Sequence, residues 1–227
     1  MYSIFLSKID QSFNQIENKL KRIIKPGSKV AIFPWAFPNE IDSYRLNNEY
    51  FKKGERKYCK YVDKLLQLGI SEKDVIICDC YAFSTQKLKR IINKSDILVF
   101  PGGNPEMLFY NILHRTETFY TLKKSNKIII GESAGAVMQF ERYFATTKNN
   151  YYNYLAFYDG FGIIDDNFYI DVHTTTDDDY ISELQMIANQ KGKKIYAIPD
   201  EGCMIYNRSN HKIEYKSNVI EIAPKED

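Results

Sequence analysis

Ser133 lies in a Gly-x-Ser-x-Gly pattern, Gly131-Glu132-Ser133-Ala134-Gly135, directly after the apolar run at residues 128–130. That run is short, β-branched and closed by a glycine, which predicts a buried strand. The small residues after Ser133 suit the first turn of a packed helix. A serine at such a strand–turn–helix junction is held clear of the sheet as a nucleophile, although the pattern alone also occurs in structural turns.

A serine hydroxyl becomes an effective nucleophile when a base removes its proton, and histidine is the usual base. The chain has three histidines. His114 falls within a predicted helix and His211 in a polar turn, so we expect both at the surface. His173 follows a predicted strand, residues 168–172, which we expect to join the same sheet as the serine strand. His173 is therefore the predicted general base.

The residues alone leave open which carboxylate orients this imidazole. The candidates are Asp165, Asp166, Asp171, Asp200 and Glu201. Asp171 shares a strand face with His173 because side chains two residues apart point the same way. Asp200 and Glu201 follow the next predicted strand and can also reach the site.

Two backbone N–H groups are expected to stabilise the oxyanion of an acyl-transfer intermediate. Ala134, the residue after the nucleophile, supplies one of them. The second is assigned to Gly103, in preference to Gly102, because a glycine loop lets the backbone approach the reacting carbonyl. This loop follows a predicted strand at residues 96–100.

The composition is that of a globular protein with a substantial core, since 44% of the 227 residues are hydrophobic. A formal net charge of +2 without a dense Lys/Arg block does not favour nucleic acid as a partner. We find neither a signal-peptide pattern nor an apolar run long enough to span a bilayer. The four cysteines lack metal-ligand spacing and are interpreted as reduced thiols of a cytoplasmic protein.

Strand and helix patterns alternate along the chain, which predicts an α/β fold with a mostly parallel sheet covered on both faces. Expected strands cover residues 29–34, 75–78, 96–100, 128–130, 168–172 and 194–198. Expected helices cover residues 9–24, 41–68 with Gly54 as a possible break, 85–93, 106–124 and 177–189. A terminal hairpin is expected at 204–206 and 212–215, with 219–222 as a candidate addition. Ligands of such sheets bind at the carboxyl ends of the strands, where Ser133 and the glycine loop fall.

The set of motifs resembles the serine peptidases that include aspartyl dipeptidase (peptidase E) and cyanophycinase. The resemblance covers about residues 28–207 and is carried, in the family's order, by Phe100-Pro101-Gly102-Gly103-Asn104, Gly131-Glu132-Ser133-Ala134-Gly135-Ala136, Gly160-Phe161-Gly162-Ile163-Ile164, Asp171-Val172-His173 and Pro199-Asp200-Glu201-Gly202. It implies a single domain, residues 1–227, related to class I glutamine amidotransferases. The implied architecture is a flavodoxin-like three-layer sandwich with a small C-terminal β extension.

The same resemblance implies Ser133 as nucleophile, His173 as base, and Gly103 with Ala134 as the oxyanion hole. It ranks Glu201 first as the third triad member, because Glu201 matches the acid of cyanophycinase-like members. Asn104 and Asp171 are expected to contact the substrate, a short peptide. Neither a metal nor an organic cofactor is implied, and the expected assembly is a monomer or homodimer.

The chain departs from the family pattern at two places. Residues 146–150 hold no carboxylate, although peptidase E-like members carry their acid there, which further favours Glu201. Residues 174–180 hold three aspartates and no arginine, whereas members that act on aspartyl substrates carry arginines there. We therefore expect no preference for aspartyl peptides. Two alternatives remain: an α/β-hydrolase-type esterase, which runs Ser, acid, His along the chain, and a catalytically degenerate binding protein.

Overall fold

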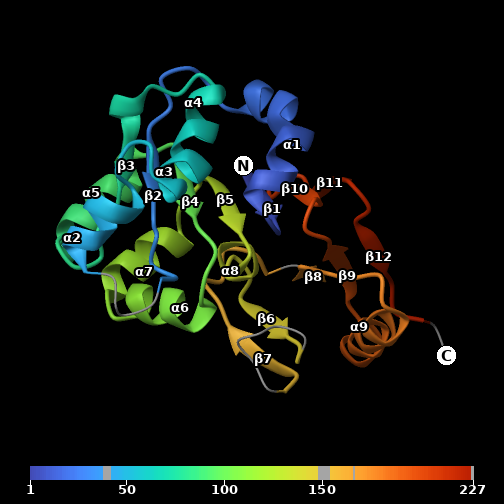
Figure 1. Cartoon of the computed structure of the whole chain (residues 1–227). Helices are drawn as coiled ribbons and strands as arrows, with labels where there is room; N and C mark the ends of the chain where they lie inside the picture. Colours follow the sequence, from blue (N-terminus) through green and yellow to red (C-terminus); the bar gives the residue numbers. More distant parts are fainter. Residues whose placement is uncertain (38–41, 148–153, 166, 226–227) are drawn as a thin grey trace.

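The computed structural model describes residues 1–37, 42–147, 154–165 and 167–225. Its main sheet is built from β1 (Tyr2–Leu6), β2 (Val30–Ile32), β3 (Val75–Ile77), β4 (Ile97–Phe100), β5 (Ile128–Glu132), β10 (Cys203–Asn207) and β11 (Lys212–Lys216). The strand order is β11-β10-β1-β5-β4-β2-β3. Strands β1 to β5 pair in parallel, and β10 and β11 extend the sheet antiparallel beyond β1 (Figure 1).

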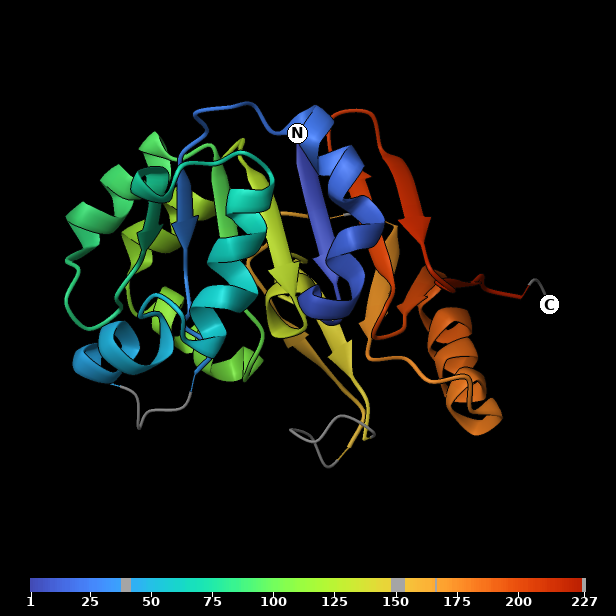
Figure 2. The same cartoon turned by 45° about the horizontal axis from the view of Figure 1, so that its top comes forward.

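Helical segments cover both faces of this sheet. On one face lie α1 (Ile9–Ile23), α2 (Ser43–Arg45), the π-helical η1 (Leu46–Tyr50), α3 (Arg56–Tyr58), the π-helical η2 (Cys59–Asp63) and α4 (Lys64–Gln67). On the other lie α5 (Thr85–Lys94), α6 (Pro105–Leu113), α7 (Thr116–Lys123) and α8 (Ala134–Val137). Figure 2 shows α1 (blue) and residues 56–67 (cyan) in front of the parallel strands.

The strands bury their side chains alternately in the two layers, which is why their sequences are apolar throughout. In β1, Ile4 and Leu6 join the core under α1, whereas Phe5 joins the core under α5 to α8. In β4, Ile97 and Val99 face the first layer, and Leu98 and Phe100 face the second. The predicted three-layer α/β sandwich is confirmed.

Two predicted helices are interrupted. Residues 42–68 form short α- and π-helical segments, with Gly54 at a φ of 90° between η1 and α3. The segment 106–124 forms two helices, α6 and α7, which break around Arg115, whose φ is −115°. The possible break at Gly54 is therefore present, whereas the break around Arg115 was not predicted because apolar periodicity continues across it.

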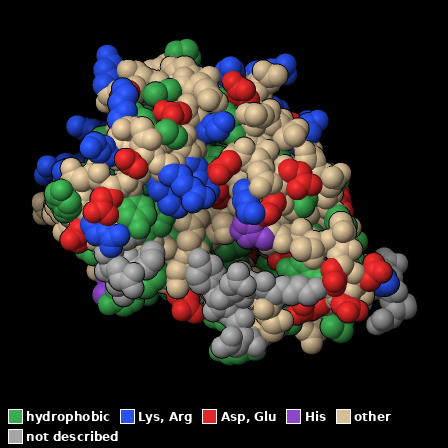
Figure 3. All heavy atoms as spheres, viewed as in Figure 1, with side chains coloured by type: hydrophobic (Ala, Val, Ile, Leu, Met, Phe, Trp, Pro, Cys, Tyr) green, Lys and Arg blue, Asp and Glu red, His purple; other side chains and the backbone are tan. Residues whose placement is uncertain are grey.

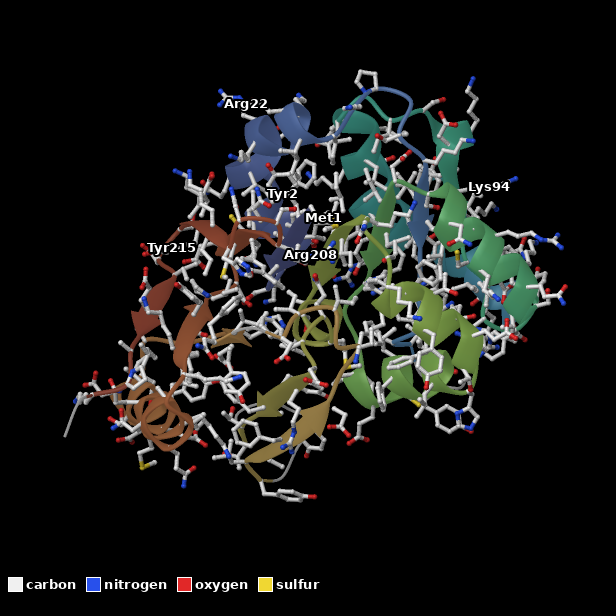
Figure 4. All side chains as sticks on the ribbon, turned by 180° about the vertical axis from the view of Figure 1, so that it is seen from behind. Met1, Tyr2, Arg22, Lys94, Arg208 and Tyr215 are labelled. Carbon is white, nitrogen blue, oxygen red and sulfur yellow. The ribbon has the colours of Figure 1, made fainter. Side chains whose placement is uncertain are left out.

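Strand β1 is a central strand of the main sheet that the sequence pattern did not predict. It pairs in parallel with β5 and antiparallel with β10, with Tyr2 opposite Asn207. Met1 and Arg208 lie side by side (Figure 4), where the Arg208 N–H donates to the Met1 carbonyl at 2.8 Å. The strand has five residues, and both of its partner strands lie far from it in the sequence.

The strand that leads to His173 belongs to a second sheet, so the prediction that it joins the main sheet is wrong. β8 (Phe168–Val172) pairs in parallel with β9 (Lys194–Ile198), and β12 (Ile220–Ile222) pairs antiparallel with β9, in the order β12-β9-β8. The candidate addition at 219–222 therefore completes this sheet and does not extend the β10–β11 hairpin. α9 (Asp178–Lys191) packs on it, and β6 (Arg142–Ala145) and β7 (Ala156–Asp159) form a separate hairpin (Figure 1).

Candidate active site

Ser133 lies between β5 and α8 with φ 49° and ψ −114°, a backbone conformation that side-chain-bearing residues rarely adopt. The turn is so tight that its two flanking glycines have no room for a side chain. A Cβ on Gly131 would lie 2.1 Å from the Gly135 carbonyl oxygen, and one on Gly135 would lie 2.0 Å from that of Phe100. Both glycines of the motif are therefore required by close backbone contacts.

The structure brings Ser133 and His173 together, although they come from different sheets. Nε2 of His173 lies 2.9 Å from Oγ of Ser133, within hydrogen-bond distance. His173 lies just beyond β8 at a φ of 61°, and its side chain is 38% exposed. In the space-filling view a histidine reaches the surface near the middle of the face, beside basic and acidic side chains (Figure 3).

The carboxylate behind the imidazole belongs to Asp200, and the expectation that Glu201 occupies this place is corrected. Nδ1 of His173 lies 2.6 Å from Oδ1 of Asp200. Glu201 accepts a hydrogen bond from Asn218 at 3.4 Å instead. The two acids are neighbours in the loop after β9, so their side chains leave it in different directions, and only the turn geometry decides which one meets His173.

The end of β1 connects the parts of this site. The Leu6 carbonyl accepts the Ser133 N–H at 2.8 Å. The buried Ser7 hydroxyl accepts the His173 N–H at 3.1 Å and donates to the Ile198 carbonyl at 2.7 Å. The Leu6 carbonyl and the Ser7 hydroxyl thus hold Ser133 and His173 in place relative to each other.

The glycine loop after β4 runs directly past the nucleophile. A Cβ on Gly102 would lie 3.1 Å from the Ser133 Cβ, and one on Gly103, at φ 150°, would lie 2.4 Å from the Ala36 carbonyl oxygen. The Gly102 N–H points at Glu132 Oε2, 3.4 Å away. Ala134 is the first residue of α8, so its N–H has no acceptor within that helix. Gly103 and Ala134 therefore remain the candidate oxyanion donors.

Glu132, which was not among the predicted site residues, is a 4%-exposed carboxylate beside the nucleophile. Its Oε1 accepts the Ile9 N–H at 2.8 Å and pairs with Lys60 Nζ at 2.8 Å. Its Oε2 accepts the Tyr61 hydroxyl as well as the Gly102 N–H. Burial, followed by the charge of Glu132, raises the pKa of Tyr61 well above its ordinary value. Glu132 is an acidic residue inside an otherwise apolar and small-residue stretch, and this contrast is the sequence signal that could have identified it.

The two residues expected to contact the substrate have structural partners. The Asn104 side chain caps α6 by accepting the Met107 N–H at 3.2 Å. Asp171 is 8% exposed and accepts hydrogen bonds from Thr174 at 2.5 Å and Tyr180 at 2.9 Å. Burial raises the pKa of Asp171 to about 6, against the opposing effect of these two hydrogen bonds. Asp171 therefore supports the loop that carries His173.

The other acid candidates do not reach the imidazole in the part of the chain that the structure describes. Asp165 directly follows the isolated bridge between Phe140 and Ile164, and it lies near Arg142 at the start of β6. Asp166 lies outside the described residues. Within the described ranges, no helix is long and apolar enough to cross a membrane, and no group of three or more His, Cys, Asp or Glu side chains is placed to hold a metal ion.

Comparison with known proteins identifies the family and supports the fold. The family model for peptidase family S51 matches residues 50–214. A candidate peptidase E protein from Listeria monocytogenes EGD-e is 18% identical, with a TM-score of 0.61 over 95% of this chain and 97% of that one. A peptidase from an acI-B1 actinobacterium is 12% identical, with a TM-score of 0.59 over 99% of this chain and 95% of that one.

Because these two structures are only 18% and 12% identical to the chain, they support the fold alone. No curated protein matches the chain. The family model spans most of the chain and includes the serine turn, His173 and Asp200. The chain therefore belongs to peptidase family S51 and is a serine-type peptidase.

Proposed function

We propose that the protein hydrolyses short peptides through an acyl-enzyme, with Ser133 as nucleophile, His173 as general base and Asp200 as the acid that orients the imidazole. The observation that carries the proposal is the 2.9 Å separation between Ser133 Oγ and His173 Nε2. An acid on the far nitrogen keeps the proton on Nδ1 and leaves Nε2 free to accept the serine proton.

In the proposed reaction, His173 takes the hydroxyl proton as Ser133 attacks the scissile carbonyl carbon. The carbonyl oxygen becomes an oxyanion and accepts hydrogen bonds from the Ala134 and Gly103 N–H groups. The imidazolium then gives its proton to the leaving amine, and the C–N bond breaks. A water molecule, deprotonated by His173, attacks the acyl-enzyme and releases the acid product with regeneration of Ser133.

We further propose that this peptidase does not prefer aspartyl substrates. Asp177 caps α9 by accepting the Tyr180 N–H at 3.0 Å, and Asp178 and Asp179 form the first turn of that helix. All three side chains are exposed. No arginine follows His173 in this segment to pair with a substrate carboxylate, and three negative charges there disfavour an acidic side chain.

A dipeptide series tests the activity and the preference together. Wild-type protein and Ser133→Ala are compared on Ala-Leu, Lys-Leu and Asp-Leu, with leucine release as the measurement. We expect hydrolysis by the wild type, none by Ser133→Ala, and the lowest kcat/KM on Asp-Leu. Turnover that survives Ser133→Ala contradicts the mechanism, and a clear Asp-Leu preference contradicts only the proposed specificity.

The two alternatives receive less support. The order Ser133, His173, Asp200 differs from the Ser, acid, His order of α/β-hydrolase esterases, and Asp171 faces Thr174 and Tyr180. A comparison of ester and peptide substrates separates the two activities. The short contact between Ser133 and His173 argues against a degenerate binding protein, and labelling of Ser133 by a fluorophosphonate would count further against it.

A further inference from the structure

We propose that Lys8 is a positioning residue of the active site, the fourth member of a hydrogen-bonded chain that runs Ser133, His173, Asp200, Lys8. The inference rests on the proposed function and adds a residue to it. Lys8 Nζ lies 2.5 Å from Asp200 Oδ2, while Asp200 Oδ1 lies 2.6 Å from His173 Nδ1. Each oxygen of the carboxylate thus has its own charged or polar partner, which fixes the rotation of the carboxylate about its Cβ–Cγ bond.

The main chain around Lys8 is held firmly enough to deliver its side chain to one place. Lys8 follows Ser7, whose hydroxyl bonds both His173 and Ile198. The Lys8 carbonyl accepts the Gln11 N–H at 3.1 Å, and the Ser12 N–H at 3.0 Å, at the start of α1. The lysine therefore starts from a fixed point between β1 and α1, at the same strand end that holds Ser133 and His173.

Lys8 also acts on the charge of the site. Partial burial opposes ionisation of Asp200, but hydrogen bonds from His173 and Lys8 hold the pKa of its carboxyl below the ordinary value. The neighbouring charged groups on the adjoining elements are Glu201, which bonds Asn218, and the Lys60–Glu132 pair, which also approaches Asp10. Within the described residues, Lys8 is the only cation that pairs with Asp200.

A cation at this position has two consequences for catalysis. It keeps Asp200 oriented, so that Oδ1 stays directed at Nδ1 of the imidazole. It also favours the ionised form of Asp200, because a positive charge nearby disfavours protonation of the carboxylate. The Lys8 and Asp200 side chains are 44% and 34% exposed, so solvent weakens both effects.

The test compares Lys8→Met with Lys8→Arg, and with Lys19→Met as a matched control. Lys19 lies on α1 and pairs with Glu214 at 3.0 Å with similar exposure, 34% and 39%, away from the triad. Steady-state kcat, KM and the pH profile of kcat/KM are measured for each variant on the best dipeptide substrate. The thermal midpoint of each variant reports whether it folds.

For Lys8→Met we expect kcat to fall about tenfold with KM nearly unchanged, because the base is less well oriented. The acid limb of kcat/KM should move to higher pH by about half a unit, as expected for a lost charge in mostly aqueous surroundings. Lys8→Arg should restore both quantities, and Lys19→Met should behave as wild type. If Lys8→Met does not fold, Lys8→Arg must still keep the wild-type acid limb and kcat within about twofold.

The inference is overturned if Lys8→Met and Lys19→Met give the same pH profile and kcat, or if Lys8→Met raises KM alone. The second result would make Lys8 a substrate contact. Failure of the proposed function is a separate result, in which wild-type protein shows no hydrolysis that Ser133→Ala removes.

Discussion

Replacing Asp200 by Asn is the sharpest test of how this site works, because the structure dictates how the new amide must turn. Lys8 Nζ lies 2.5 Å from Oδ2, and it can donate but not accept hydrogen bonds. The amide oxygen of Asp200→Asn must therefore face Lys8. The amide NH₂ then faces Nδ1 of His173, which lies 2.6 Å from the present Oδ1.

That arrangement selects the wrong imidazole tautomer. Nδ1 must accept the amide hydrogen, so the ring proton moves to Nε2, which then points at Ser133 and cannot take the hydroxyl proton. A triad whose histidine is held in this tautomer loses about 10⁴-fold in kcat. We expect a loss of about 10³- to 10⁴-fold for Asp200→Asn, with little change in KM. The substitution is nearly isosteric and leaves the fold in place.

Glu201→Gln is the matched control, since this neighbouring acid bonds Asn218 and does not face the imidazole. Its kcat should stay within about twofold of wild type, because it leaves no catalytic group altered. Initial rates of dipeptide hydrolysis and the rate of Ser133 labelling by a fluorophosphonate give two independent measurements. A large loss in Glu201→Gln together with wild-type rates in Asp200→Asn would refute the assignment of Asp200.

Two further substitutions test the oxyanion loop and the buried acid. Gly103→Ala should lower kcat about 10²- to 10³-fold in the same dipeptide assay, since its Cβ would lie 2.4 Å from the Ala36 carbonyl oxygen and must displace a proposed oxyanion donor. A variant with wild-type kcat would exclude that donor. Asp171→Asn should remove a pH dependence of stability, because the pKa of Asp171 is raised from 3.8 to about 6 by burial. The folded state keeps its proton where the unfolded state has lost it, so this residue's contribution to the free energy of unfolding falls as pH rises from about 4 to above 6, by about 3 kcal/mol in total. Urea unfolding of both proteins across that range should show the difference, and parallel curves would contradict it.

Sequence patterns pointed to Ser133 and His173 more clearly than to the residues that hold these two side chains in place. Ser133 was found because the glycines of a tight turn leave a local pattern, and the close contacts of Gly131 and Gly135 explain that pattern. Asp200 and Glu201 are neighbours, and only the course of the chain after Pro199 turns the first of them to His173. A backbone turn of this kind has no signature that distinguishes two adjacent acids.

The failure to predict strand β1 and the second sheet has a different cause. β1 has five residues, and its place in the main sheet depends on strands more than a hundred residues away, Ile128–Glu132 and Cys203–Asn207. Periodicity reports local burial and does not state which strands become neighbours. The same limit explains why β8 was expected in the main sheet, although it pairs with β9 and delivers His173 from outside it.

The position of β1 has a consequence for when activity can arise during synthesis. Strand β1 is completed on one side by β5 and on the other by β10, with Tyr2 opposite Asn207. Ser7 likewise bonds Ile198, 191 residues later. Contacts this distant in sequence form only after nearly all of these residues have emerged, and they slow folding. A nascent chain that has not yet exposed β9 and the residues after it lacks Asp200 and the Ile198 carbonyl, so we expect its Ser133 and His173 not to be positioned for catalysis.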